Sequence, residues 1–216
     1  MSIDPSLRRL RLDGGATLSY TRLVLATGSQ PIRLDAPGMG LAGVMTFRDL
    51  ADVTAMEAAV ARHRNVVVIG GGLLGLEAAY GLAKAGANVS VVHLMDRLME
   101  RQLDARAAAM LKHEVEGRGI AVHLNDQTTA IRGRGRVEAV TLEDGRNLAA
   151  DLVVVAAGIR PSVDLARTAD LDINRGIVVD DHLQTSRPGI FAIGECAEHR
   201  GVCYGLVEPA YEQARV

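Results

Sequence analysis

One glycine-rich segment constrains the fold of this 216-residue chain more than any other feature. Residues 70–75 read GGGLLG. They follow an unbroken β-branched run, VVVI at 66–69, and precede a helical pattern over 73–85 that ends at Gly86. The β-branched run is too short and too uniform for a helix, so it predicts a buried strand. A strand, a glycine-rich turn and a helix in this order predict a βα unit of a parallel sheet.

The same segment contains the spacing G-x-G-x-x-G, and each glycine has a separate physical reason. Gly70 permits a tight turn out of the strand, Gly72 lets a diphosphate approach the backbone, and Gly75 lets the helix pack close to the strand. Free amides at the start of the helix, at Leu73 and Leu74, would face that diphosphate with the positive end of the helix dipole. A tight turn without a ligand is the alternative. The strand before the motif and the helix after it favour a dinucleotide site.

The sequence leaves the choice between NADH and NADPH open. Folds of this kind place an acidic residue about 20 residues after the motif, where it binds the adenosine ribose. Here His93 takes that place. A histidine would not repel a 2′-phosphate, and Arg97 or Arg101 could reach one, but Asp96 lies nearby and the arginines would also be stable in solvent alone.

Glu77 follows the last motif glycine by two residues, which we expect to be within the first helical turn. It has two interpretations. It either complements the positive end of the helix, or it lies beside the nicotinamide ring and orients it.

The rest of the chain alternates strand and helix patterns, which predicts an α/β fold with a Rossmann-like, doubly wound parallel sheet. Aromatic residues make up only 3% of the chain and Trp is absent, so Val, Leu, Ile and Ala must fill a sheet buried on both faces under helices. A capping box formed by Thr46 and Asp49 is expected to start a helix. Strands are expected at residues 8–12, 16–20, 22–26, 66–69, 89–93 and 120–124, with a small antiparallel excursion over 130–155.

Composition excludes several classes of function. The formal net charge of −2 gives no electrostatic reason to expect nucleic acid or anionic membranes as partners. The longest apolar runs, such as 152–159, are too short to cross a membrane, and arginines interrupt the N-terminus where a signal core would lie. Cys196 and Cys203 do not have metal-site or dithiol spacing. We therefore expect a cytoplasmic protein with two reduced thiols and no metal.

Three further segments carry a resemblance to a known family. Residues 19–31 (SYTRLVLATGSQP), 151–161 (DLVVVAAGIRP) and 185–195 (TSRPGIFAIGE) resemble segments of two-dinucleotide flavoprotein reductases of the rubredoxin reductase and glutathione reductase type. The resemblance implies that Thr27, Gly194 and Glu195 face FAD. It also implies that Gly158, together with Glu77, lies on the nicotinamide side. Most members of the family have Asp where this chain has Glu195.

Two stretches narrow the resemblance. Residues 91–104 and 193–213 resemble the large subunits of assimilatory NAD(P)H nitrite reductases and the related electron-transfer subunits of assimilatory nitrate reductases. This implies hydride transfer from NAD(P)H to FAD, with electrons passing on to iron–sulfur and sirohaem centres outside these residues. A rubredoxin- or ferredoxin-reductase type, which passes electrons to a separate acceptor protein, is one alternative. A non-catalytic nucleotide-binding module or redox sensor is another.

The resemblance also sets an expected domain organisation. Only one G-x-G-x-x-G motif is present, whereas such reductases begin with another that holds FAD. We therefore expect a fragment with an NAD(P)-binding domain at 37–159 between partial FAD-domain segments at 1–36 and 160–216. Such a fragment should be colourless, bind NAD(P)H weakly and lack reductase turnover. A homodimer is compatible with the sequence, which does not determine the oligomeric state.

Overall fold

The computed structural model describes residues 1–61 and 64–216, and these form two compact units. Unit 1 consists of Met1–Gln30 and Ile159–Val216, and unit 2 consists of Pro31–Gly158. Unit 2 is thus one continuous segment inserted between the two parts of unit 1. The NAD(P)-binding domain expected at 37–159 stays a prediction.

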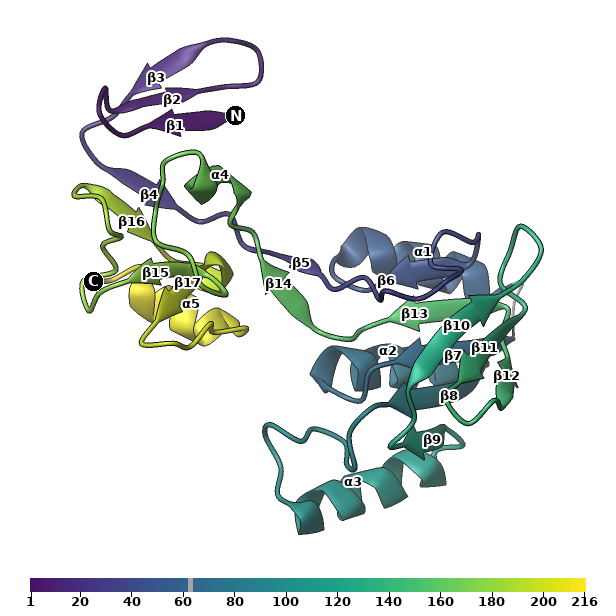
Figure 1. Ribbon diagram of the computed structural model, residues 1–216. Helices are drawn as coiled ribbons and strands as arrows, with labels where there is room; N and C mark the ends of the chain where they lie inside the picture. Colours follow the sequence, from purple (N-terminus) through teal and green to yellow (C-terminus); the bar gives the residue numbers. More distant parts are fainter. Residues whose placement is uncertain (62–63) are drawn as a thin grey trace. The chain divides into compact units, whose positions relative to one another are not determined.

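Unit 2 is built on a parallel sheet with the strand order β6-β13-β7-β8-β9 (Figure 1). The α/β class with a parallel sheet is therefore confirmed. Its strands are β6 (Val44–Thr46), β7 (Asn65–Ile69), β8 (Asn88–His93), β9 (Ala121–Leu124) and β13 (Leu152–Val155). Its helices are α1 (Leu50–Val60), α2 (Leu73–Lys84) and α3 (Ala105–Gly117).

Different layers cover the two faces of this sheet. Val66 and Val68 pack in one core cluster with residues of α1, α2 and α3, whereas Val67 and Ile69 pack in another with the antiparallel strands. Those strands are β10 (Thr128–Arg132), β11 (Ala139–Leu142) and β12 (Asn147–Ala149). The expectation of helices on both faces is wrong for the second face. The antiparallel excursion covers it instead, because its apolar side chains supply the same burial.

Helix α1 begins later than the sequence suggested. Its N-cap is Asp49, which accepts from the N–H of Asp52, while the Asp52 side chain accepts from the Asp49 N–H at 3.2 Å. The expected Thr46–Asp49 capping box is therefore wrong. Thr46 is the last residue of β6 and pairs with Val155 of β13, so its backbone is committed to the sheet.

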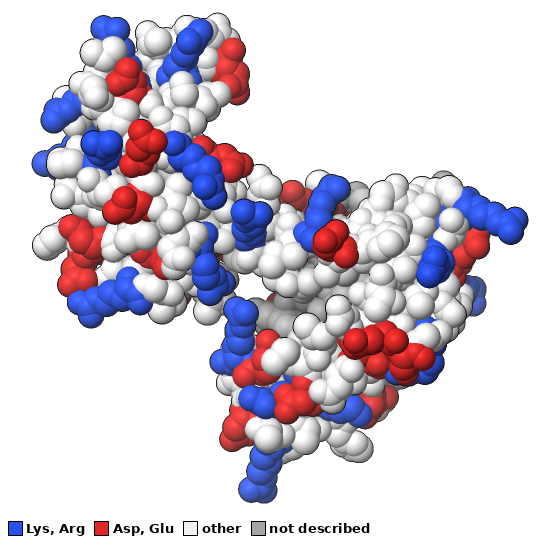
Figure 2. Space-filling view, in the orientation of Figure 1, with Lys and Arg blue, Asp and Glu red and all other residues white. Residues whose placement is uncertain are grey.

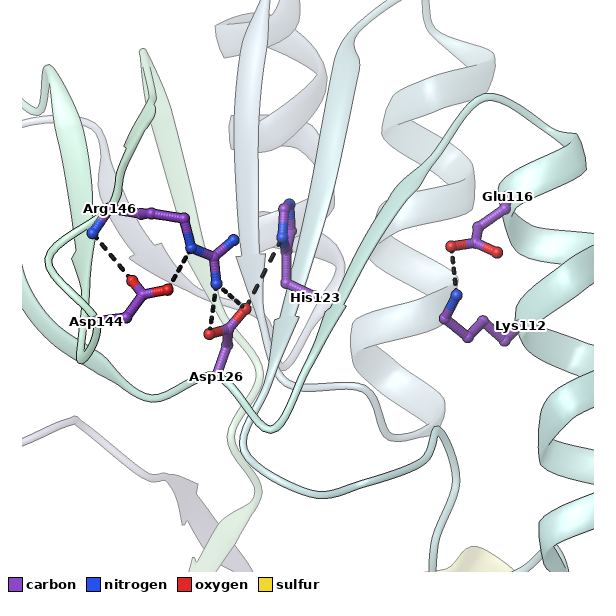
Figure 3. Close-up of polar contacts among 6 residues, drawn as sticks. All are labelled: Lys112, Glu116, His123, Asp126, Asp144 and Arg146. Carbon is purple, nitrogen blue, oxygen red and sulfur yellow. Dashed lines mark hydrogen bonds and ion pairs between the residues drawn. The ribbon is translucent and has the colours of Figure 1, made fainter.

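Ion pairs tie together the loops at one end of unit 2 (Figure 3). The Arg146 guanidinium, in the turn between β11 and β12, donates to both carboxylate oxygens of Asp126 at 2.8 Å and also pairs with Asp144. The backbone N–H of Arg146, followed by its guanidinium, holds the pKa of Asp144 below its usual value. His123 of β9 approaches Asp126 at 3.9 Å. These contacts join the loop between β9 and β10 to the turn between β11 and β12 and give no sign of a reactive centre.

Unit 1 contains short strands around its own apolar core. Strands β1, β2 and β3 form an antiparallel sheet, β4 pairs in parallel with β16, and β15 pairs in parallel with β17. Strands β5 and β14, where the chain leaves and re-enters this unit, also pair. The elements are β1 (Ser2–Asp4), β2 (Arg9–Arg11), β3 (Thr17–Ser19), β4 (Leu23–Leu25), β5 (Ser29–Pro31), β14 (Ile159–Pro161), α4 (Asp164–Arg167), β15 (Ile177–Val179), β16 (Ile190–Ala192), η1 (Gly194–Cys196), β17 (Ala197–His199) and α5 (Val207–Gln213).

The surface charge, the helices, the cysteine thiols and the possible metal ligands of the described residues bear on what the sequence predicts about partners, membranes and metals. Basic and acidic side chains are interspersed over the face drawn in Figure 2. Within residues 1–61 and 64–216, every helix is too short or too polar to span a bilayer. Both Cys196 and Cys203 are free thiols. Among these same residues, no group of three His, Cys, Asp or Glu side chains has a metal-binding arrangement.

Candidate dinucleotide-binding site

The glycine turn between β7 and α2 is forced by close backbone contacts. Gly70 has a φ of +125°, and a Cβ there would lie 2.3 Å from the carbonyl oxygen of Ala156, which follows β13. A Cβ on Gly75 would lie 2.0 Å from the carbonyl oxygen of Gly70. Both distances are far below van der Waals contact. These two glycines are therefore needed for the turn itself and for the close approach of α2 to the sheet.

Gly72 has no such structural reason to be glycine. Its φ of −84° and ψ of −174° suit any residue, and a Cβ would meet no heavy atom of the described chain within 4 Å. Packing and backbone conformation therefore both leave room for a side chain. What glycine preserves is open space beside the backbone at the start of α2, where a diphosphate would lie.

Helix α2 leaves its first amides available. Gly72 is the N-cap, and no side chain of the described residues caps this end. The first turn is formed by Leu73 and Leu74, followed by Gly75 and Leu76, and Leu73 is half-exposed. The leading N–H groups of a helix have no partner within the helix and carry the positive end of its dipole. This end of α2 therefore has the geometry and the charge of an anion-binding site.

Glu77 does not lie where the sequence suggested. Because α2 begins at Leu73, Glu77 is the fifth helical residue and belongs to the second turn, and the first turn contains no acidic residue. The expectation of a first-turn carboxylate is therefore wrong. The side chain is exposed on the helix surface. Its role beside a nicotinamide ring stays a prediction.

His93 ends β8 and packs directly over the glycine turn. Its Nδ1 accepts a hydrogen bond of 3.0 Å from the buried N–H of Gly71, and its Nε2 lies 3.1 Å from Oε2 of Glu100. A Cβ on Gly71 would lie 2.7 Å from both the His93 ring and a methyl carbon of Leu98. Both ring nitrogens of His93 are thus used within the protein. The sequence pattern alone indicates no role for Gly71 or Glu100, because it does not show the course of the loop after β8.

Arg97 lies in the same loop, and its guanidinium turns toward a neighbour. Its Nη1 donates to Oδ1 of Asp96 at 3.1 Å, and its side chain is about one-third exposed. The Nε of Arg97 is buried without an acceptor among the residues described. Arg97 is therefore partly neutralised by Asp96, while Arg101 extends into solvent with a side chain that is 78% exposed.

Gly158 lies just after β13, where the chain leaves unit 2. Its φ is +106°, a conformation that favours glycine, and its carbonyl oxygen accepts from the N–H of Ile32 at 3.0 Å. The positive φ at the point where the chain leaves unit 2 thus accounts for a glycine at this position. The nicotinamide contact expected of it stays a prediction.

The residues expected to face a flavin lie in unit 1, where the atoms described have protein partners. The Thr27 hydroxyl donates to the carbonyl of Ser162 at 2.6 Å, and the N–H of Gly194 donates to the Gln213 side chain at 2.6 Å. Glu195 accepts from the Ser29 hydroxyl at 2.7 Å. The structure thus brings Glu195 beside β5, a contact between residues far apart in sequence that no local pattern could reveal. Their contacts to FAD stay predictions.

Comparison with known proteins agrees with this geometry. The sequence profile described as Pyridine nucleotide-disulphide oxidoreductase matches residues 1–214. The chain is 49% identical over 216 residues to a Nitrite reductase [NAD(P)H] of Bacillus subtilis (strain 168). This match covers 100% of the chain and 27% of the relative. It is 44% identical over 215 residues to the Assimilatory nitrate reductase electron transfer subunit of the same organism, covering 100% of the chain and 28% of the relative.

A solved structure shares the fold over the full chain. The ferredoxin reductase for the CYP199A2 system from Rhodopseudomonas palustris superposes with a TM-score of 0.96 at 37% identity, covering 100% of this chain and 55% of that one. The chain thus spans between about a quarter and about half of the proteins that it matches. With a profile that matches nearly every residue, the chain belongs to the pyridine nucleotide-disulphide oxidoreductase family.

Proposed function

We propose that this chain binds NAD(P)H in unit 2 and that the protein containing it is a flavoprotein reductase, most closely a nitrite reductase. Gly72 carries the proposal. It lies at the uncapped start of α2 among the described residues, in a conformation that any residue could adopt, with open space where its Cβ would be. A diphosphate fits that space and the free amides beside it.

The proposed roles of the residues follow from their positions. Gly70 and Gly75 shape the turn, Gly72 leaves room for the diphosphate, and the amides at Leu73 and Leu74 bind it. When bound, the nicotinamide supplies a hydride, which the family passes to a flavin. The chain itself contributes binding and orientation, since its site region offers no nucleophile paired with a base among the residues described. Glu77 and Gly158 on the nicotinamide side, and Thr27, Gly194 and Glu195 on the flavin side, are further parts of the proposal.

The parent protein has two candidate activities. Similarity to the nitrite reductase and the nitrate reductase subunit of Bacillus subtilis favours electron transfer toward iron–sulfur and sirohaem centres located outside these residues. The TM-score of 0.96 with a ferredoxin reductase favours delivery to a separate acceptor protein. The remainder of the protein distinguishes them, because sirohaem- and cluster-binding segments belong only to the first. The cytoplasmic location and the homodimer stay predictions.

Calorimetric titration of the chain with NADH tests the proposal. A Gly72→Ala variant should raise the Kd at least about tenfold while leaving the melting temperature within about 2 °C, because its Cβ meets only the bound diphosphate. Gly81→Ala is the matched control. It lies in the same helix, its Cβ also meets nothing within 4 Å in the described chain, and it should leave the Kd unchanged. Wild-type chain that binds neither NADH nor NADPH would refute the proposal.

A further inference from the structure

The His93 ring joins the glycine turn to the loop after β8 in one defined protonation state. The N–H of Gly71 donates to Nδ1, so Nδ1 carries no hydrogen. The ring proton of a neutral imidazole must then lie on Nε2, which donates to Oε2 of Glu100 at 3.1 Å. The Glu100 carboxylate lies seven residues after the end of β8 in the sequence. A single side chain, that of His93, links it to Gly71 of the dinucleotide motif.

The loop that carries Glu100 is itself fixed against the turn. The N–H of Met99 donates to the carbonyl of Gly71 at 3.0 Å, and the Leu98 side chain is completely buried. The Glu100 side chain is 24% exposed. Its other oxygen, Oε1, forms an ion pair with Nε of the exposed Arg101 at 3.9 Å, a distance too long for a hydrogen bond. Glu100 therefore combines a fixed position with an oxygen able to accept further hydrogen bonds.

We propose that Glu100 is the residue that determines coenzyme specificity, with His93 as its positioning residue. Glu100 would accept hydrogen bonds from the adenosine ribose hydroxyls and repel a 2′-phosphate, so that the chain prefers NADH over NADPH. It takes over the task that this fold usually gives to an acidic residue at the end of the second strand. The inference rests on the proposed function, because it requires a nicotinamide coenzyme in unit 2.

Asp96, Arg97 and Arg101 are further charged residues of the loop after β8, and each is more exposed than Glu100. Arg97 is a candidate for binding a 2′-phosphate, but its guanidinium donates to Asp96. The side chains of Asp96 and Arg101 are 64% and 78% exposed, so water screens their charges. Glu100 is more buried than either and is the carboxylate bonded to His93. Glu100 is therefore the least exposed of these acidic and basic groups.

The test is the ratio of the Kd values for NADPH and NADH, measured by calorimetry on the 216-residue chain. Wild type should bind NADH more tightly. Glu100→Gln keeps an acceptor for Nε2 but removes the charge, and it should lower the ratio at least about tenfold. Glu114→Gln, on the exposed surface of α3, is the matched charge control and should leave the ratio unchanged.

His93→Ala separates positioning from general stability. If His93 only stabilised the loop, its loss would weaken the binding of both coenzymes equally and leave the ratio at the wild-type value. That result would contradict the positioning role. We expect the ratio to fall toward that of Glu100→Gln. The double variant should show no further fall, since both changes remove the same interaction.

The failures of the two proposals are distinguishable. A wild-type chain that binds neither coenzyme contradicts the proposed function and this inference with it. A chain that binds both coenzymes equally, or whose ratio is the same in Glu100→Gln as in wild type, overturns the role of Glu100 alone.

Discussion

Glu198 is a buried carboxylate that shapes the turn before β15. Its Oε2 accepts from the N–H groups of Arg175 and Gly176, and its Oε1 accepts from the side chain of Asn174, all at 2.8 Å. These bonds, led by that from Gly176, lower the pKa of Glu198 against the opposing effect of burial. A carboxylate in this position stabilises the fold only while it is ionised.

Replacing Glu198 with Gln should lower the free energy of unfolding by about 1–3 kcal/mol at pH 7. Because the pKa is lowered in the folded state, the carboxylate contributes fully above its unfolded value of about 4.3, and the contribution is lost as pH falls through the folded-state pKa. The difference between wild type and variant should therefore shrink below about pH 4. Urea unfolding measured from pH 7 downward checks this.

Glu208→Gln is the control for this charge removal, because Glu208 is exposed on α5. It should change the free energy of unfolding by less than about 0.5 kcal/mol. A Glu198→Gln penalty that stays constant across the whole pH range would contradict the role of the ionised carboxylate.

At the scale of the element, the glycines at the start of α2 have two kinds of role. Gly70 and Gly75 are needed for folding, whereas Gly72 is proposed to be needed for binding. Gly75→Ala should lower the free energy of unfolding by about 1–3 kcal/mol, because its Cβ would lie 2.0 Å from a backbone oxygen that cannot move aside without shifting β7. Gly81→Ala, in the same helix and in open space, should raise it by up to about 1 kcal/mol. Thermal unfolding followed by circular dichroism measures both changes. Equal melting temperatures for the two variants would contradict the close packing of Gly75 against Gly70.

The sequence predicted those elements whose causes are local. The VVVI run and the glycines after it predicted β7, the turn and α2, because strand propensity and the need for close approach act within a few residues. The capping residue of α1 was assigned wrongly, since pairing of Thr46 with β13 decides where the helix begins. The contact between His93 and Glu100 could not be predicted, because it depends on how the loop after β8 folds back on Gly71. The contact between Glu195 and Ser29 could not be predicted either, because the whole of unit 2 lies between these two residues in the chain.

At the scale of the whole molecule, the two units have separate cores, so coenzyme binding should protect them unequally. NADH at about 100 times its Kd should add about 2.7 kcal/mol to the opening free energy of unit 2. Hydrogen exchange should slow most in β7, in β8 and at Gly71, whose N–H is already bonded to His93. The amides of β15 in unit 1 serve as the internal reference. Equal protection of β15 and β7 would contradict the assignment of the coenzyme to unit 2.

The insertion of unit 2 within unit 1 has a consequence for biosynthesis. Strand β4 pairs in register with β16, Leu23 opposite Ile190, so it leaves the ribosome long before its neighbour is translated. Unit 2 is contiguous and can complete its own core in the meantime. During that delay the apolar edge of the nascent β4 is open to pairing with other chains. Slow translation or a shortage of chaperones should therefore harm this protein first through β4.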